Sequence, residues 1–276
     1  YQGSKPVMWS PVEQTALAEA EVEYHDKESH TVWVKFKVED VSPKKSGWSA
    51  RDLDEDEITK KNVGELSRRL EAIKDAYVVI WTTTPWTIPS NKAVVYGKGI
   101  SYGLYEITET PDECWASTGE RYLLADNLAS DVLGKARLEE GQWKRLRDVS
   151  NEELASITLK HPLAGAEGSN GEWDDLRNFR AADFVTDTEG TGFVHCAPSH
   201  GLEEYELYRD LGMFDEETSW LEKVITHNVN PDGRFRDNLP FFGGKAILKP
   251  NGKEGNANAA IIDKLIEVGG LLARGK

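Results

Sequence analysis

The chain has 276 residues and a formal net charge of −15, because 48 Asp and Glu outnumber 33 Lys and Arg. That charge argues against a free-standing nucleic-acid binder, which normally presents a basic face, although a basic groove within an acidic molecule is compatible with it. Apolar residues form 39% of the chain and charged residues 29%, a balance typical of a globular protein rather than a disordered one. No apolar run approaches the roughly 18 residues of a membrane span, so none is expected.

The chain begins YQGSKPVMW, without an initiator Met and without the basic and apolar regions of a signal peptide. This start predicts an excised piece of a longer protein. The cysteines are Cys114 and Cys196. They are too few for a disulfide scaffold or a four-ligand structural zinc site, and we interpret them as reduced thiols of an intracellular protein.

In the first part of the chain, residues 1–27 are interpreted as a connector and residues 40–60 as a charged surface excursion. Between them, residues 31–38 alternate in polarity, which predicts a half-buried strand whose apolar face consists of Val32, Val34, Phe36 and Val38. Apolar residues then recur at helical spacing, which predicts a helix through Val63, Leu66, Leu70 and Ile73.

Segment 77–81 is short, apolar and β-branched, as expected of a buried strand, and Pro85 and Pro89 predict a non-helical loop after it. Further strands are expected near 92–96, 101–107, 142–148, 155–159, 182–186 and 193–196. Helices are expected near 126–135, at 201–211 with Gly212 as the C-cap, and through Ile261, Leu265 and Val268 as far as Gly269. Many short strands with scattered helices predict a β-rich α+β fold rather than repeated βαβ units.

The first candidate functional motif is WTTTPWTIPSN at residues 81–91. Three threonines at a strand end offer hydroxyls that both donate and accept hydrogen bonds, and Pro85 stops the strand so that nearby backbone also faces a ligand. Such a loop suits a ribose, an ester carbonyl or a positioned water. A threonine-rich strand end with ordinary turn chemistry is the alternative interpretation.

The second candidate motif is EGTGFVHCAPSHGLEEY at residues 189–205. It puts His195 at a strand end and Glu203 and Glu204 at a helix start, where a carboxylate favours a cationic ligand group such as an ammonium. The alternative is that the glutamates only complement the helix dipole and that His195 is structural.

Other chemistries find little support in these motifs. His195 and Cys196 cannot pair as base and nucleophile, because neighbours on a strand point to opposite faces. A metal site made of these two residues and His200 matches no established ligand spacing. The Gly-Gly-Lys at 243–245 lacks the flanking residues of a P-loop, and the Gly-Thr-Gly at 190–192 is too short to indicate dinucleotide binding.

Taken together, the motifs at 81–91 and 190–205 resemble the editing domain of isoleucyl-tRNA synthetases, a large insertion in the catalytic core of class I synthetases for branched aliphatic amino acids. The sister families for valine and leucine carry an Arg within the Thr motif and lack the His before Ala-Pro, so Thr84 and His195 favour the isoleucine type. The resemblance covers nearly the whole chain. It implies a β-barrel-like α+β domain with peripheral helices that hydrolyses valyl-tRNA carrying the isoleucine anticodon, and it leaves open hydrolysis of valyl-adenylate as well.

The resemblance implies roles for the first motif. Thr82, Thr83 and Thr84 hold the terminal adenosine, the ester and the attacking water, and Asn91 supports them. Trp86 lines the pocket for the amino-acid side chain. No covalent nucleophile is implied, because a positioned water attacks an ester that is already activated.

In the second motif, the resemblance implies that His195 limits the pocket against isoleucine and that His200 lies beside it. Glu204 stands where the family usually has an Asp that binds the α-ammonium of the substrate. Because Glu is one methylene longer, either a small shift of Glu204 or replacement by Glu203 is required.

The resemblance also implies an organisation, with residues 1–27 as a connector from the synthetase core, 28–250 as the editing domain and 251–276 as a helix and return connector. The HIGH and KMSKS signatures are absent, so ATP and Mg belong to the synthetic core and editing needs no cofactor. Residues 9–14 contain no cysteines, which excludes a zinc knuckle there. The expected partners of this cytoplasmic monomer are the aminoacylated 3′ end of isoleucine tRNA and the rest of the synthetase in cis.

Other classes of function stay open at this point. A non-catalytic module would bind the acceptor end of tRNA without hydrolysis, which a deacylation assay distinguishes. A free-standing deacylase acting in trans is opposed by the missing Met and the connector-like ends. A β-rich structural domain with coincidental motifs is opposed by two long motifs in the right order.

Overall fold

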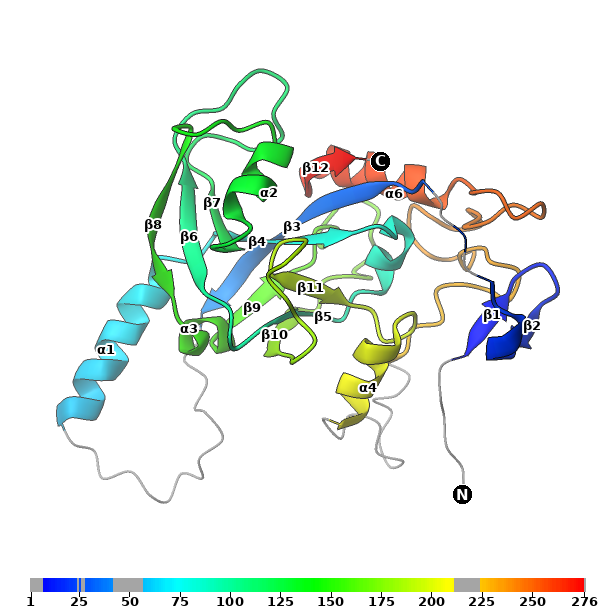
Figure 1. The fold of residues 1–276 in the computed structure, drawn as a ribbon, viewed down its shortest axis with the longest axis horizontal. Helices are drawn as coiled ribbons and strands as arrows, with labels where there is room; N and C mark the ends of the chain where they lie inside the picture. The colour runs from blue at the N-terminus through cyan, green and yellow to red at the C-terminus, as the bar shows by residue number, and fades with distance from the viewer. Residues whose placement is uncertain (1–6, 24, 26–27, 42–56, 211–223, 276) are drawn as a thin grey trace.

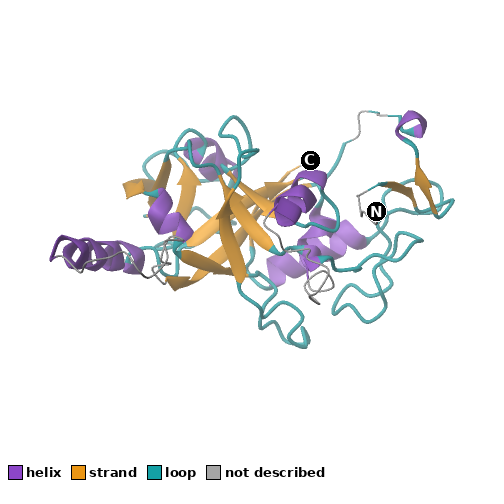
Figure 2. Ribbon diagram, turned by 90° about the horizontal axis from the view of Figure 1, so that it is seen from below, coloured by secondary structure: helices purple, strands orange, loops and turns teal. Residues whose placement is uncertain are grey.

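The computed structural model describes residues 7–23, 25, 28–41, 57–210 and 224–275. Strands occupy β1 Met8–Ser10, β2 Thr15–Leu17, β3 Thr31–Val41, β4 Tyr77–Thr82, β5 Ala93–Tyr96, β6 Tyr102–Ile107, β7 Arg121–Ala125, β8 Trp143–Val149, β9 Ile157–Lys160, β10 Arg177–Ala181, β11 Phe193–Cys196 and β12 Leu271–Gly275. Helices occupy α1 Glu57–Glu71, α2 Ala129–Lys135, α3 Asn151–Ala155, α4 Leu202–Asp210 and α6 Ala257–Glu267, with 3-10 helices η1 Glu19–Glu21 and η2 Pro85–Ser90. The helices lie around one large sheet (Figures 1 and 2), which confirms the expected β-rich α+β class.

The main sheet has ten strands in the order β11-β5-β10-β9-β3-β4-β7-β6-β8, with β12 paired to β3. It curls, because a 3.2 Å hydrogen bond from Ala125 N to Thr191 O joins the end of β7 to the segment before β11. Gly192 lies at this contact with a φ of 79°, and a Cβ there would collide with Ala125. The Gly-Thr-Gly of the second motif therefore serves a close approach within the sheet.

The central strand β3 pairs with β4, β9 and β12. The prediction that it is half-buried is wrong for its first half, since Trp33 and Lys35, on the face opposite to Val32 and Val34, are only 8% and 4% exposed. The Lys35 ammonium lies 3.2 Å from both Glu120 Oε1 and the Trp115 carbonyl oxygen. A buried ammonium needs such partners, and alternation along one strand cannot reveal that a second layer covers it.

The two prolines after β4 do not produce the expected non-helical loop. They belong to the 3-10 helix η2, in which Thr87 N donates to Thr84 O at 3.0 Å. Pro85 stands at the start of this helix, where its missing N–H costs nothing. A short helix with i→i+3 bonds also accommodates Pro89, although a longer α-helix would not.

Some strands lie away from their predicted positions. β10 occupies Arg177–Ala181 rather than 182–186, because its parallel pairing with β5 fixes its register. β7 was not expected, and α3 takes the start of segment 155–159, so that β9 begins at Ile157. The other expected strands and helices agree with the structure to within a few residues. The middle of the charged excursion (42–56) and Gly212 lie outside the described residues, as does the side chain of Val63.

Glu153 in α3 is fully buried and joins three elements. Its carboxylate accepts hydrogen bonds from Arg69 of α1 and Arg147 of β8, each at 2.7 Å, and from the backbone of Ser150 at 2.9 Å. Burial raises the pKa of Glu153, but these hydrogen bonds outweigh it and hold the pKa below its usual value.

Glu153→Ala should lower the free energy of unfolding by about 2–3 kcal/mol, because it removes the buried carboxylate that accepts hydrogen bonds from Arg69, Arg147 and the backbone of Ser150. Urea denaturation at neutral pH measures this loss. Glu152→Ala, at an exposed position of the same helix, is the control, and equal losses in the two variants would contradict the assignment. Because the folded pKa is lowered, the contribution of Glu153 is present above pH 4.5 and is lost as the pH falls through the folded value.

Candidate functional site

Thr82, Thr83 and Thr84 form the turn between β4 and η2. Thr82 Oγ1 accepts a hydrogen bond from Thr84 N at 3.1 Å and lies 3.2 Å from Thr84 Oγ1. The next residue, Pro85, has no N–H to continue the strand pairing. The hydrogen bond from Thr84 N to the Thr82 side chain therefore supports the turn. Thr82 is buried and Thr83 and Thr84 are exposed, so the latter two present their side chains at the surface.

His195 is held between two residues of the first motif. His195 Nε2 lies 3.0 Å from Thr87 Oγ1, and His195 Nδ1 lies 3.5 Å from Asn91 Nδ2. Thr87 uses its hydroxyl proton to donate to Thr84 O at 2.9 Å, so it accepts from Nε2–H of the imidazole. Nδ1 then accepts from the Asn91 amide, and the network fixes one neutral tautomer. Burial, with a smaller effect of His200, lowers the pKa of His195 to about 4.

Trp86 and His200 form a second group beside the first. Their rings meet edge to face with centroids 4.8 Å apart. His200 Nε2 lies 3.1 Å from Ser90 Oγ, which also accepts from Asn228 Nδ2 at 3.1 Å. Trp86 N donates to Asn258 Oδ1 of α6 at 2.9 Å. Burial, followed by His227, lowers the pKa of His200 to about 4, so this imidazole is also neutral at pH 7.

The two glutamates of α4 differ in their surroundings. Glu203 is exposed, whereas Glu204 is half-buried with its carboxylate folded back over Gly201, where a Cβ would collide with it. Burial raises the pKa of Glu204, and burial together with this carboxylate raises the pKa of the Cys196 thiol. Of the two candidates, Glu204 therefore faces the protein interior beside β11.

A cavity of about 800 Å³ opens beside Trp86 and His200. Trp9, His227 and Ile247 also line it, and the β1–β2 hairpin is fastened at its edge by Trp9 Nε1, which donates to Pro231 O at 2.8 Å. The volume falls within the usual range for small-molecule sites. The three threonines and His195 are not among its lining residues, so the structure divides the predicted residues between a hydrogen-bonded cluster and a cavity wall.

Several residues of the site were not predicted. Thr87 and Ser90 lie inside the first motif. Because their hydroxyls can donate and accept hydrogen bonds as those of the other threonines do, the same reasoning could have identified them. Asn228 and Asn258 lie far away in sequence and have no local signal, because only tertiary packing brings them to η2.

The sequence predicts no metal site at His195, Cys196 and His200. Within the part of the chain that the structure describes, no group of three His, Cys, Asp or Glu side chains is arranged to hold a metal ion. Alternation along β11 turns Cys196 away from His195. Among the described residues, no helix is both long and apolar enough to cross a membrane.

Residues 1–226 match the family model described as class I tRNA synthetases (I, L, M and V). The chain belongs to this family. Over its full length it is 63% identical to an isoleucine–tRNA ligase of Ruegeria pomeroyi and 44% identical to one of Brucella abortus, and it covers 24% and 26% of their lengths. The chain thus spans about a quarter of the curated relatives that it matches.

Among solved structures, the editing domain of the cytosolic leucyl-tRNA synthetase of P. knowlesi aligns with a TM-score of 0.49 and 12% identity. The alignment covers 88% of this chain and 96% of that one.

The buried, neutral His195 of this synthetase segment predicts pH-dependent stability. A histidine in the unfolded chain titrates near 6.5, whereas the pKa of folded His195 is about 4. Because the folded pKa is lowered, the stability from the neutral imidazole is complete above pH 6.5 and is lost as the pH falls toward 4. Between pH 7 and pH 5, the free energy of unfolding should fall by about 2 kcal/mol through this residue.

Urea denaturation of the parent chain and of His195→Gln at both pH values measures this difference. The variant should lack that part of the pH dependence. His25→Gln is the control, since the side chain of His25 is 78% exposed. An unaltered pH dependence in His195→Gln would show that the imidazole is not neutral and buried as described.

Proposed function

We propose that this chain is the editing part of an isoleucine–tRNA ligase and hydrolyses valine from mischarged isoleucine tRNA. The observation that carries the proposal is the hydrogen bond between Thr87 and His195, because it joins one residue from each motif across 108 positions of the sequence. The high identity to isoleucine–tRNA ligases over the whole chain supports it.

The need for such a site follows from the limits of recognition. One missing methylene changes binding by only about 1–3 kcal/mol, and isoleucine against valine is the standard example of this limit. A synthetic site for isoleucine therefore accepts valine at some rate. A second site that admits valine and excludes isoleucine removes the error after transfer to tRNA.

The reaction proposed is hydrolysis of the aminoacyl ester. A water oxygen attacks the carbonyl carbon, the bond to the ribose oxygen breaks, and that oxygen leaves with a proton to give valine and uncharged tRNA. Thr83 and Thr84 present hydroxyls that position the water and stabilise the developing oxyanion, while Thr82 holds the turn. The free hydroxyl of the ribose assists the proton transfer.

His195 is suited to limit the size of the side-chain pocket. Thr87 and Asn91 fix its ring on both nitrogens, so the imidazole cannot swing away from a longer side chain. Its neutrality also avoids repulsion of the substrate ammonium. Glu204 is proposed to bind that ammonium, since an approaching positive charge restores the ionised carboxylate that burial disfavours.

The cavity at Trp86 and His200 is proposed to receive the amino-acid side chain, with Trp86 lining it and His200 beside it, while the threonine turn holds the terminal adenosine. The cavity lies next to the threonine turn through η2. The proposal requires no cofactor, and ATP and Mg act in the synthetic core outside this segment. The rest of the synthetase is proposed to act in cis, with residues 28–250 as its editing domain. The whole protein is proposed to be a cytoplasmic monomer.

Thr83→Ala combined with Thr84→Ala should slow release of valine from valyl-tRNA at least about 100-fold, the usual cost of losing oxyanion and water contacts. Single-turnover deacylation of tRNA charged with labelled valine measures the rate. Thr118→Ala, at an exposed position elsewhere, is the matched control. A folded double variant with the parent rate rules out the role of the threonines, and an inactive but tRNA-binding parent chain supports a non-catalytic module instead.

His195→Ala should open the pocket to isoleucine. The preference for valyl-tRNA over isoleucyl-tRNA should fall by about 10- to 200-fold, because the pocket can then hold the additional methylene of isoleucine. The ratio of the two deacylation rates within one preparation provides an internal control for loss of fold. If that preference survives, another residue sets the size limit.

A further inference from the structure

Helix α6 packs firmly on the rest of the fold and leads into β12. Ile261 and Leu265 on its inner face are fully buried, and β12 pairs with β3 in the main sheet. The helix also lies against η2, the 3-10 helix of the first motif. A side chain at the start of α6 is therefore held at a fixed place relative to the threonine turn.

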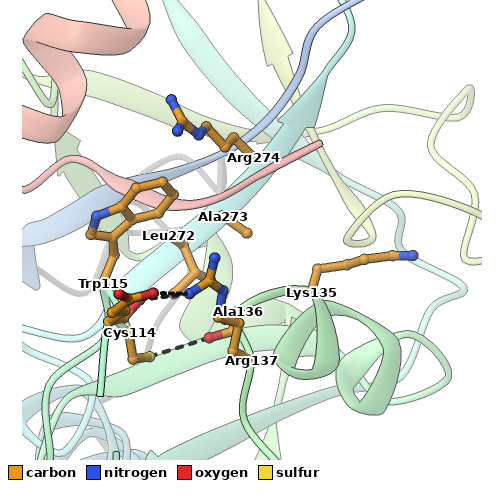
Figure 3. A pocket seen from close by; sticks show the side chains of 9 residues that line it. Cys114, Trp115, Lys135, Ala136, Arg137, Leu272, Ala273 and Arg274 are labelled. Atoms are coloured by element: carbon orange, nitrogen blue, oxygen red, sulfur yellow. Dashed lines mark hydrogen bonds and ion pairs between the residues drawn. The ribbon is translucent and has the colours of Figure 1, made fainter. Parts of the chain in front are cut away.

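Strand β12 also lines a second cavity, of about 360 Å³, at the end of α2 (Figure 3). Lys135, Arg137 and Arg274 line this basic cavity, and Glu113 pairs with Arg137 at 3.1 Å. The Arg274 guanidinium lies 5.6 Å from the centre of the Trp115 ring, a cation–π contact. This contact adds to the strand pairing that holds β12 in place, and with it the end of α6.

Asn258, the second residue of α6, joins this helix to the first motif. Its Oδ1 accepts from Trp86 N at 2.9 Å, and its Nδ2 donates to Glu254 Oε1 at 2.9 Å. A backbone N–H can only donate and an ionised carboxylate can only accept, so the two neighbours agree on one orientation of the amide. Glu254 Oε1 lies in turn 3.5 Å from His30 Nε2. The Asn258 amide is therefore oriented by the protein itself.

The start of η2 is satisfied in an unusual way. Thr84 is its N-cap residue, and a threonine at that position normally accepts from one of the first backbone N–H groups of the helix. In the part of the chain that the structure describes, the Thr84 side chain makes no such bond. Trp86 N is bound by Asn258 instead. Thr87 N donates to the backbone carbonyl of Thr84. Asn258 thus caps η2 from another element, and the Thr84 hydroxyl stays available.

We propose that Asn258 is a positioning residue for hydrolysis of the aminoacyl ester, because it caps η2 in place of Thr84 and leaves the Thr84 hydroxyl to contact the attacking water. The inference rests on the proposed function, which assigns that water to Thr84. Without Asn258, the Thr84 hydroxyl would turn to accept from the unpaired Trp86 N–H, as an ordinary N-cap does, and would leave the water. The same bond fixes the backbone of Trp86, whose ring lines the larger cavity.

Asn258→Ala should slow single-turnover deacylation of valyl-tRNA by about 10- to 100-fold at saturating enzyme, because a reacting group is misplaced. The enzyme concentration that gives half the maximal rate should change little, since the lost contact orients the water rather than binding the tRNA. Asn251→Ala is the matched control, because it removes a similar bond, from Lys253 N to Asn251 Oδ1, at an exposed turn.

A double-mutant cycle with Thr84→Ala separates positioning from a general loss of structure. If Asn258 acts through the Thr84 hydroxyl, adding Asn258→Ala to Thr84→Ala should slow the reaction less than about twofold. The exchange of groups in Asn258→Asp with Glu254→Gln keeps an acceptor for Trp86 N and a donor between the two side chains, so it should restore most of the rate.

Hydrogen exchange at the Trp86 amide tests the capping without any substrate. In Asn258→Ala the amide should stay protected, because Thr84 takes over as acceptor. In Asn258→Ala with Thr84→Ala it should exchange at least about tenfold faster than in either single variant.

Three results would overturn the inference. They are equal slowing by Asn258→Ala with and without the Thr84 hydroxyl, a Trp86 amide that loses its protection fully in Asn258→Ala alone, and one that keeps it in the double variant. A parent chain without deacylation activity would overturn the proposed function and this role with it. The exchange rates would then still decide whether Asn258 and Thr84 compete for the Trp86 amide, so the two failures are distinguishable.

Discussion

The candidate site depends on the antiparallel pairing of β11 with β5. In that register His195 lies opposite Val94, and Cys196 lies opposite Ala93. Since η2 connects β4 directly to β5, the pairing brings the histidine against the 3-10 helix that carries Thr87. The contact of Gly192 with Ala125 at the other end of β11 fixes the strand along its length. The motifs at 81–91 and 189–205 form one cluster because β11 pairs with β5 at the edge of the sheet.

The cluster is built from neutral hydrogen-bonding groups. His195 and His200 both have pKa values of about 4 because burial disfavours their charged forms. Thr87 and Asn91 contact both nitrogens of His195, and Ser90 contacts Nε2 of His200, so oriented hydrogen-bonding groups surround both imidazoles. Such an arrangement suits a reaction in which the protein positions water and substrate and in which charge develops only on the ester.

Two buried charges elsewhere in the fold are paired with residues of opposite sign. Lys35 and Glu153 are buried, but each has a partner of opposite sign, and these pairs join β3, α1, β8 and α3 around the sheet. The basic cavity at Arg274 differs, because its cations outnumber its acidic residue.

Periodicity and motif chemistry determined much of this protein from sequence. The alternation at 31–38, the apolar run at 77–81 and the helix ending at Gly269 each follow from local patterns, and the Thr and His motifs identified the residues that the fold brings together. Tertiary structure alone decided the rest. It buried Lys35, turned the prolines of 85–89 into a 3-10 helix, and brought Asn258 to Trp86. It also set Arg274 across Val32 from Thr82. The physical reason is that local patterns record which way a side chain points along its own element, whereas partners far away in sequence are chosen by strand register and packing.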